Sequence, residues 1–358
     1  MEPRQGIGVA DVPRGVGLHT VTNERRFCLC KISWGLSSAG RAPDLHSGGQ
    51  EFDPPRLHHI LLVLDDPIGL EGGMKICAIT MVYQDYWALS QWYAHYSRHL
   101  GSDNLFVVAH GRDPMVAALC PRANVITVPR DDLTGFDRMR GQMLNSIQDG
   151  LGVAYDWVIR TDVDELICLD PAYYGSFDEL FGSHRKFSAL FALGMNVAEG
   201  ADDEALVQTD AVLTKRRNAV FSGHYSKAWA VRRGTHLVRH GINLTKNATF
   251  IMPEGIYLAH LKFANINALT DANVHREKIA NGTQLGLPGK AWREADKDAM
   301  KFFDVFEKTP VLSWGEARAK AYAEISTTYV AEEAQKVLRA KSICFDFRTV
   351  LPEWFRYC

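Results

Sequence analysis

Three acidic residues between positions 162 and 165 give this chain its clearest candidate for chemistry. Asp162 and Asp164 flank Val163 shortly after the apolar run Trp157–Ile159. Residues i and i+2 of an extended segment point to the same side, so the pattern predicts that both aspartates project together at the carboxyl end of a strand. Close carboxylates repel each other unless a cation joins them, and Mg²⁺ or Mn²⁺ commonly links carboxylates to substrate phosphates. The pattern therefore indicates a divalent-metal site.

Exposed turns often contain an Asp-x-Asp triplet by chance, so the surrounding elements must distinguish a metal site from a solvated turn. From residue 74 onward, apolar runs alternate with amphipathic segments. Asp85 has the residue type of a helix N-cap, and Gly101 that of a helix stop. Strands are predicted at 75–82, 105–109, 124–128 and 156–161, and helices at 85–100 and 136–151. This alternation predicts parallel strands with right-handed crossovers, whose carboxyl ends bind ligands.

The second half of the chain is less regular. We expect one strand over 187–197, an acidic loop over 198–209, and short strands at 228–232, 236–238 and 256–260. Helices are expected over 292–306 and 315–338. The predicted fold class is α/β, with a doubly wound, mostly parallel but mixed sheet flanked by helices.

Residues 1–73 differ in composition from the rest. They hold 11 of the 29 glycines and 6 of the 14 prolines, about twice the density expected for a fifth of the chain. No hydrophobic period persists there, so we predict a poorly ordered N-terminal extension. A clean strand pattern begins directly after Gly73, which suggests that Met74 is the natural start and that the extension is not native. Residues 74–310 then form the main domain and 311–358 a C-terminal helical extension.

Composition narrows the function classes. The chain has 358 residues and a net charge of −2, whereas a general nucleic-acid binder usually carries a basic excess. No apolar run approaches the ~20 residues that span a bilayer, so no transmembrane segment is expected. The seven cysteines are odd in number and scattered, which disfavours a secreted disulfide framework and favours reduced thiols in the cytoplasm. Cys77 and Cys168 lie in apolar runs and are expected in the core.

Four segments, in this order, resemble bacterial family 2-like glycosyltransferases, which have the GT-A fold. They are MKICAITMVY at 74–83 with Asp85-Tyr86-Trp87, NLFVVAHG at 104–111, FDRMR at 136–140, and YDWVIRTDVDEL at 155–166. The last resembles the Asp-x-Asp strand of the family. The resemblance covers about residues 74–265 and is weaker beyond.

The resemblance implies a nucleotide-sugar donor and Mn²⁺ or Mg²⁺ held by Asp162 and Asp164. It also implies that the loop after the first strand, here Val82, Tyr83 and Asp85, lines the nucleotide pocket. The family's usual acidic residue at the end of the second strand, which contacts the base, is replaced by Ala109-His110. Asp113 is a candidate substitute, and the identity of the base is left open.

Two further groups are candidates for metal or phosphate binding. His260 closes the apolar segment 256–259, and a late histidine often completes the metal site in the resembled enzymes; imidazole suits Mn²⁺ better than Mg²⁺. The alternative is a hydrogen-bonded core histidine. Lys262, Arg138 and Arg140 are candidate phosphate contacts, with Arg138 slightly preferred over Arg140, although both arginines also fit a solvated helix face. The loop 221–227 fits either a sugar-binding turn or an ordinary hairpin.

The proton acceptor is not assigned by the sequence. Inverting transfer needs a carboxylate near the acceptor hydroxyl, and retaining transfer does not. The acidic segment after residue 197 offers several candidate bases, namely Glu199, Asp202, Asp203, Glu204 and Asp210. Neither the stereochemistry nor the base can be chosen from this pattern.

The predicted function is metal-dependent transfer of a sugar from a nucleotide-diphosphate sugar to a glycan or lipid-linked acceptor, as in polysaccharide biosynthesis. A lipid-linked acceptor would be reached by peripheral membrane association. One alternative is a nucleotidyltransferase, but such enzymes normally have a Gly-rich loop near the first strand, and residues 80–84 contain no glycine. The other is a non-catalytic nucleotide- or glycan-binding protein of the same fold.

A protein synthesised from Met74 tests the status of the first 73 residues. We expect it to fold and to retain the activity of the full chain, because the predicted core begins at residue 75. The measurement is turnover of the two proteins side by side. Loss of activity on truncation would show that the extension is needed.

Overall fold

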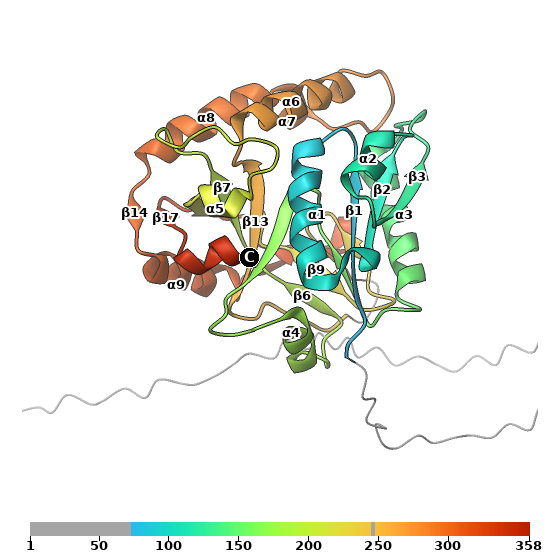
Figure 1. Cartoon of the computed structure of the whole chain (residues 1–358), viewed down its shortest axis with the longest axis horizontal. Helices are drawn as coiled ribbons and strands as arrows, with labels where there is room; N and C mark the ends of the chain where they lie inside the picture. The colour runs from blue at the N-terminus through green and yellow to red at the C-terminus, as the bar shows by residue number, and fades with distance from the viewer. Residues whose placement is uncertain (1–72, 245–247) are drawn as a thin grey trace, which may run out of the picture. The chain divides into compact units, whose positions relative to one another are not determined.

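The computed structural model describes residues 73–244 and 248–358, within the compact unit Glu71–Cys358 (Figure 1). The predicted extension over 1–73 lies outside the described residues except for Gly73. The described part is an α/β fold of mixed sheets flanked by helices, which confirms the predicted fold class.

The first sheet has the strand order β12–β6–β9–β4–β1–β2–β3. Its strands are β1 (Ile76–Val82), β2 (Leu105–His110), β3 (Asn124–Val128), β4 (Trp157–Arg160), β6 (Ala189–Phe191), β9 (Ala228–Val231) and β12 (Phe250–Ile251). Strand β1 runs parallel to β2 and β4, and β2 runs parallel to β3. The carboxyl ends of these strands therefore share one edge of the sheet, which lies toward α6 and α7 in Figure 1.

Helices cover both faces of β1, which explains its continuous apolar run. Its even-numbered apolar residues, from Ile76 to Val82, join the core that contains α1 (Tyr86–Leu100). The odd-numbered residues, from Cys77 to Met81, pack with α3 (Phe136–Leu151). Helix α1 begins after Asp85, whose carboxylate accepts from the Ala88 N–H, as its residue type predicts.

The second sheet has the order β14–β17–β8–β7–β13–β5. Its strands are β5 (Glu165–Leu169), β7 (Leu193–Ala198), β8 (Asn218–Phe221), β13 (Ile256–Phe263), β14 (Val311–Leu312) and β17 (Arg348–Val350). Strand β13 lies between β7, to which it is parallel, and β5, to which it is antiparallel. A smaller sheet contains β10 (Leu237–Val238), β11 (Gly241–Asn243), β15 (Tyr329–Glu332) and β16 (Val337–Ala340).

The chain passes between the two larger sheets at several points along one seam. It leaves β4 and enters β5 through the acidic turn 161–164, and it leaves β6 and enters β7 at Ala192. The single strand predicted over 187–197 is therefore two strands in different sheets. It crosses again between β8 and β9 through the loop 222–227. Because all these crossings join the same two sheets, the loops that make them are brought near one another.

The remaining helices connect or cover these strands. They are α2 (Pro114–Leu119), α4 (Phe177–Ser183), α5 (Val212–Lys215), α6 (Ile266–Ala280), α7 (Lys290–Arg293), α8 (Ala295–Lys308) and α9 (Trp314–Ile325), with 3₁₀ turns at Ser102–Asn104, Glu333–Gln335 and Glu353–Tyr357. The helix predicted over 292–306 is divided at Glu294, and α2 and α6 were not predicted.

The predicted C-terminal helical extension is wrong in most of its length. Helix α9 ends at Ile325, and the segment predicted to continue it to 338 instead pairs β15 with β16 in an antiparallel hairpin. The β-branched and aromatic residues Tyr329 and Val330 favour this strand. Further along, β17 joins the second sheet beside β8, and the aromatic ring of Phe355 packs on Tyr257. Residues 311–358 therefore complete the main fold.

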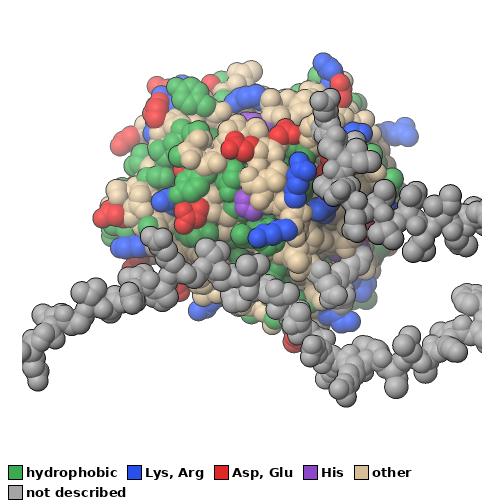
Figure 2. All heavy atoms as spheres, turned by 90° about the horizontal axis from the view of Figure 1, so that it is seen from below, with side chains coloured by type: hydrophobic (Ala, Val, Ile, Leu, Met, Phe, Trp, Pro, Cys, Tyr) green, Lys and Arg blue, Asp and Glu red, His purple; other side chains and the backbone are tan. Residues whose placement is uncertain are grey.

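The described surface and thiols agree with the composition. On the face shown in Figure 2, acidic and basic side chains are interspersed. None of the helices formed by the described residues combines the length and the apolar character that crossing a bilayer requires. Cys77 and Cys168 are buried free thiols, as predicted.

Buried His95 should make folding stability depend on pH. Burial, with a smaller effect of His99, lowers the pKa of His95 to about 3, while the unfolded chain titrates near 6.5. Protonation therefore favours the unfolded state between these values, and stability should fall as pH drops from 6.5 toward 3, by up to about 1.4 kcal/mol per pH unit.

Urea unfolding of wild-type and His95→Gln proteins between pH 7 and pH 4 measures this effect. The variant should lose less stability over that range than the wild type. Equal slopes in wild type and His95→Gln would contradict the assignment.

Candidate functional site

The acidic residues form a turn rather than the extended segment that the sequence predicted. Strand β4 ends at Arg160, and the Glu165 N–H donates to the Asp162 carbonyl at 3.1 Å, which closes the turn before β5. Asp162 and Asp164 consequently have different partners. The turn still lies at the carboxyl edge of the parallel strands, as the location of the site required.

Lys227 is the partner of Asp162. Its buried ammonium Nζ lies 2.8 Å from Asp162 Oδ2 and 2.7 Å from Glu165 Oε1. The second oxygen of Glu165, Oε2, accepts from the Asp162 N–H at 2.9 Å. Lysine and both acids thus form a closed ring that fixes the shape of the turn. Lys227 was quoted only as the end of the loop 221–227, and no role was predicted for it.

Burial and the contacts within this ring shift the pKa values of its three side chains in different directions. Contact with Lys227 holds the pKa of Asp162 well below its usual value. Burial alone would lower the pKa of Lys227, but Asp162 and Glu165 raise it, so the ammonium stays charged. Burial raises the pKa of Glu165, whose side chain is 1% exposed, whereas that of Asp162 is 59% exposed. Asp162 is therefore the ionised acid that solvent and ligands can reach.

Asp164 faces His260, as the predicted metal site required. His260 Nε2 lies 3.3 Å from Asp164 Oδ2, and His260 Nδ1 lies 2.7 Å from Asn196 Oδ1. Because an amide oxygen only accepts, Nδ1 carries the proton and the lone pair is on Nε2. Burial lowers the pKa of His260, which favours this neutral form.

The pair of Asp164 and His260 fits a cation. A lone pair on Nε2 and a carboxylate oxygen, both acceptors, face each other in a buried place, and a shared positive ion would satisfy both. Asn196 fixes the tautomer of His260, as partners of ligating histidines commonly do. Asp162 does not join them, because its Oδ2 contacts Lys227; within 73–244 and 248–358, no group of three His, Cys, Asp or Glu side chains is arranged around one ion position.

An aromatic loop adjoins this pair. The Tyr225 ring stacks on His260 with centroids 3.7 Å apart, and His224 lies 4.2 Å from His240. The loop approaches β7 so closely that a Cβ on Gly194 would stand 2.2 Å from the Tyr225 carbonyl. The sequence could not show this approach. It places the loop 221–227, which the sequence left open between a sugar-binding turn and an ordinary hairpin, directly beside the metal candidates.

The predicted nucleotide-pocket residues divide into accessible and buried groups. Tyr83 is 37% exposed after β1, whereas the Val82 side chain is buried in the core and leaves only its backbone for contact. Asp85 caps α1, and burial, together with the charge of Asp164, raises the pKa of Asp85 to about 6. These residues therefore lie along one strand end, with Asp85 close enough to sense the charge of the acidic turn.

Only some of the cationic side chains near the acidic turn are those that the sequence predicted as phosphate contacts. Arg140, rather than the exposed Arg138, lies close enough to lower the pKa of Asp162. Lys262 is partly buried, and burial and then the charge of Arg276 lower its pKa. Arg276, on α6, also acts on Asp164 and was missed because α6 was not predicted.

Most of the predicted base candidates have structural roles in the loop after β7. Glu199 pairs with buried Arg216 at 2.9 Å. Asp203 accepts from the Gly200 N–H, and Asp210 from the Val207 N–H. Asp202 is exposed on the same loop. The structure thus gives no preference for a carboxylate base.

Comparisons with known proteins assign this chain to no family. No protein-family model and no curated protein sequence matches the chain. Similar solved structures include a mannosyltransferase of Pyrobaculum calidifontis in complex with GDP-Man and Mn²⁺, at 12% identity over 71% of this chain and 75% of that one, with a TM-score of 0.32.

A CMP:2-keto-3-deoxy-manno-octonic acid synthetase complexed with CTP is also similar, at 13% identity over 44% of this chain and 74% of that one, with a TM-score of 0.26. A mannose-1-phosphate geranyltransferase of Thermus thermophilus reaches 10% identity over 78% and 74%, with a TM-score of 0.24. At these scores the likenesses carry no conclusion about the fold or the function of this chain.

Replacing Lys227 tests the ring around the acidic turn. Lys227→Met should destabilise the protein by about 3 kcal/mol, because it leaves the buried Glu165 without its counter-charge. The double variant Lys227→Met/Glu165→Gln should be more stable than Lys227→Met alone, since the uncompensated acid is removed with the lysine. Urea unfolding of the wild type and the variants, completed by Glu165→Gln alone, gives the coupling energy. Additive effects of the two substitutions would contradict the ring.

Proposed function

We propose that this protein is a metal-dependent glycosyltransferase, which transfers a sugar from a nucleotide-diphosphate sugar to a glycan or lipid-linked acceptor. The observation that carries the proposal is the facing pair of Asp164 Oδ2 and His260 Nε2, 3.3 Å apart. It lies at the carboxyl edge of the parallel strands, beside an ionised and accessible Asp162. Donor chemistry and location together suit a divalent cation that accompanies a diphosphate.

Asp164 and His260 would hold Mn²⁺ or Mg²⁺, and the ionised carboxylate of Asp162, held by Lys227, would lie beside them. When bound, the ion supplies Lewis-acid stabilisation of the negative charge that develops on the departing diphosphate. Lys227 keeps Asp162 ionised and oriented, and Asn196 keeps the lone pair of His260 directed at the site. Imidazole as a ligand favours Mn²⁺ over Mg²⁺.

Cationic side chains on both sides of the turn support a diphosphate as the ligand. Arg140 on α3 acts on Asp162, and Arg276 on α6 acts on Asp164 and Asp85. Lys262 lies two residues beyond His260 on β13. Preorganised cations of this kind stabilise phosphate oxygens without reorganisation during the reaction. They would stabilise the charge of a departing diphosphate.

The loop 222–227 would receive the acceptor. It brings the exposed His224 and the half-exposed Tyr225 beside the metal candidates, and aromatic faces suit the apolar faces of sugar rings. The loop after β1, residues 83–85, contains no glycine, which favours glycosyl transfer over the nucleotidyl transfer usually supported by a Gly-rich loop.

Two substitutions test the proposal. His260→Ala should weaken Mn²⁺ binding by about tenfold or more, because the nitrogen ligand is lost. Manganese titration followed by electron paramagnetic resonance measures this without any turnover. His184→Ala is the matched control and should bind Mn²⁺ as the wild type does. Unchanged affinity in His260→Ala would remove His260 from the site.

Hydrolysis of nucleotide sugars gives the second readout. It should require Mn²⁺ or Mg²⁺ and disappear in Asp162→Ala, while the wild type with excess chelator should also be inactive. Full turnover in the presence of chelator would contradict metal dependence. A chain that binds nucleotides but hydrolyses none of them under any metal would favour the non-catalytic alternative.

A further inference from the structure

Three side chains from adjacent strand ends form one stack beside the candidate site. Arg130 follows β3, and its guanidinium carbon lies 3.4 Å from the centre of the Tyr83 ring, which follows β1. Arg130 Nη1 lies 2.9 Å from Nδ1 of His110, the last residue of β2. Because a guanidinium only donates, His110 Nδ1 accepts and its Nε2 carries the proton. The stack holds the guanidinium in one orientation.

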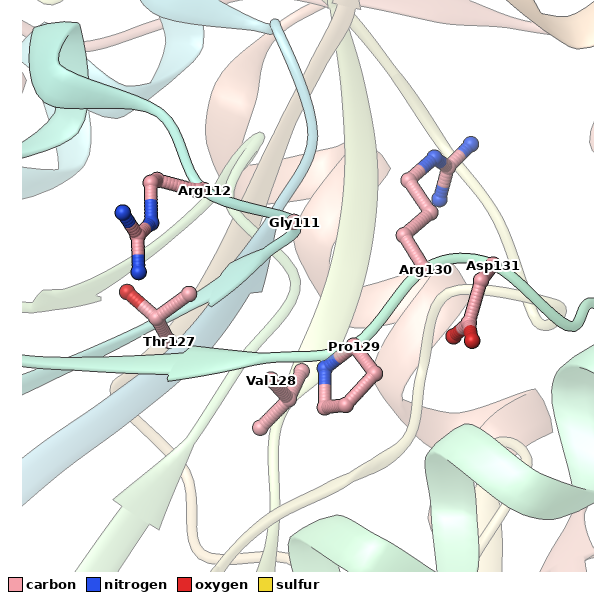
Figure 3. Close-up of a pocket in the computed structure, with 7 residues that line it drawn as sticks. All are labelled: Gly111, Arg112, Thr127, Val128, Pro129, Arg130 and Asp131. Carbon is pink, nitrogen blue, oxygen red and sulfur yellow. The ribbon is translucent and has the colours of Figure 1, made fainter.

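Arg130 of this stack lines two cavities. Tyr83 and Arg130 line an inner cavity of about 190 Å³, which α6 closes through His275 and Lys278. Arg130 also lines an outer cavity of about 380 Å³ between residues 111–112 and 127–131 (Figure 3). The His275 ring meets the Tyr83 ring edge-on at 5.7 Å. The inner cavity therefore has aromatic walls and a fixed guanidinium at one side.

The loop after α6 closes the inner cavity against the start of α3. The Gly135 N–H donates to the Leu285 carbonyl at 2.7 Å, and the Leu133 N–H donates to Gln284 Oε1 at 3.1 Å. Gly286, at φ +74°, approaches Gly135 so closely that a Cβ would stand 2.9 Å from its Cα. These contacts make the cavity a built feature of the fold.

The nearby carboxylates are engaged elsewhere, so this edge presents donors. Asp113 caps α2 through the Met115 N–H and accepts from the Tyr86 hydroxyl. Asp132 accepts from the Thr134 N–H. In Figure 3 the Asp131 carboxylate points away from the Arg130 guanidinium. A group bound in the inner cavity meets the Arg130 guanidinium.

We propose that Arg130 determines the base specificity of this protein and that the donor is a guanosine-diphosphate sugar. Guanine is the base whose major-groove edge offers two adjacent acceptors, O6 and N7, which match the two parallel donors of a guanidinium. Adenine places an amino donor beside N7, cytosine exposes an amino donor, and uracil offers a single carbonyl there. The inference rests on the proposed function, because it takes the inner cavity as the nucleoside end of the donor site.

Binding of GDP, UDP, CDP and ADP to the full chain, measured by calorimetry with Mn²⁺ present, tests the inference. GDP should bind at least tenfold more tightly than the other three. Arg130→Met should weaken GDP binding at least tenfold and UDP binding less than threefold. Arg130→Lys should lose the preference for GDP as well, because an ammonium keeps the charge but lacks the paired donors.

Arg112→Met is the matched control, since Arg112 lines the outer cavity without touching Tyr83; it should keep the preference for GDP. Tighter binding of UDP, CDP or ADP than of GDP by the wild type would overturn the inference and leave the proposed function standing. An equal loss of affinity for all four nucleotides in Arg130→Met and Arg130→Lys would also overturn the inference and leave the proposed function standing. Absence of binding to all four nucleotides would overturn both the inference and the proposed function.

Discussion

A single buried ammonium group holds the turn on which the candidate site is built. Three carboxylates fall within four residues at a place where the chain leaves one sheet for the other, and their repulsion would oppose that turn. Lys227 contacts two of them at 2.7 and 2.8 Å, which lets Glu165 stay buried and Asp162 stay ionised at the surface. The third carboxylate, Asp164, does not contact this lysine and faces His260 instead. The lysine thus divides one acidic cluster into a structural part and a part that can bind ligands.

The seam between the two sheets explains why residues far apart in sequence meet here. The acidic turn lies between β4 and β5, and the loop that delivers Lys227 and Tyr225 lies between β8 and β9. Gly194 in β7 permits the close approach of that loop, because any side chain would strike the Tyr225 backbone. Tight packing at the seam therefore sets the positions of the loops, and the loops carry the polar groups.

Local sequence patterns predicted much of the first sheet, but they predicted little of the seam between the two larger sheets. Strand β3 and helix α1 follow from short-range apolar periodicity and a capping Asp85, and the structure confirms them. The sequence also singled out Asp164 and His260, whose side chains do meet. It could not place Lys227 or Arg276, because their roles depend on contacts between distant segments. The prediction of a helix as far as residue 338 failed for a similar reason. Residues beyond Ile325 pair as β15 and β16, and this pairing outweighs a weak helical pattern.

The register of two neighbouring strands has a chemical consequence. His260 on β13 lies directly opposite Asn196 on β7, and this alignment brings the asparagine oxygen to Nδ1. A slip of one residue would put Met195 or Val197 there, neither of which has a side-chain oxygen, and the ring would no longer have a preferred proton position. The tautomer of a single imidazole is thus decided by backbone ladder alignment, so an error in assembling the sheet would appear as altered acid–base behaviour at a site whose residues are all still present.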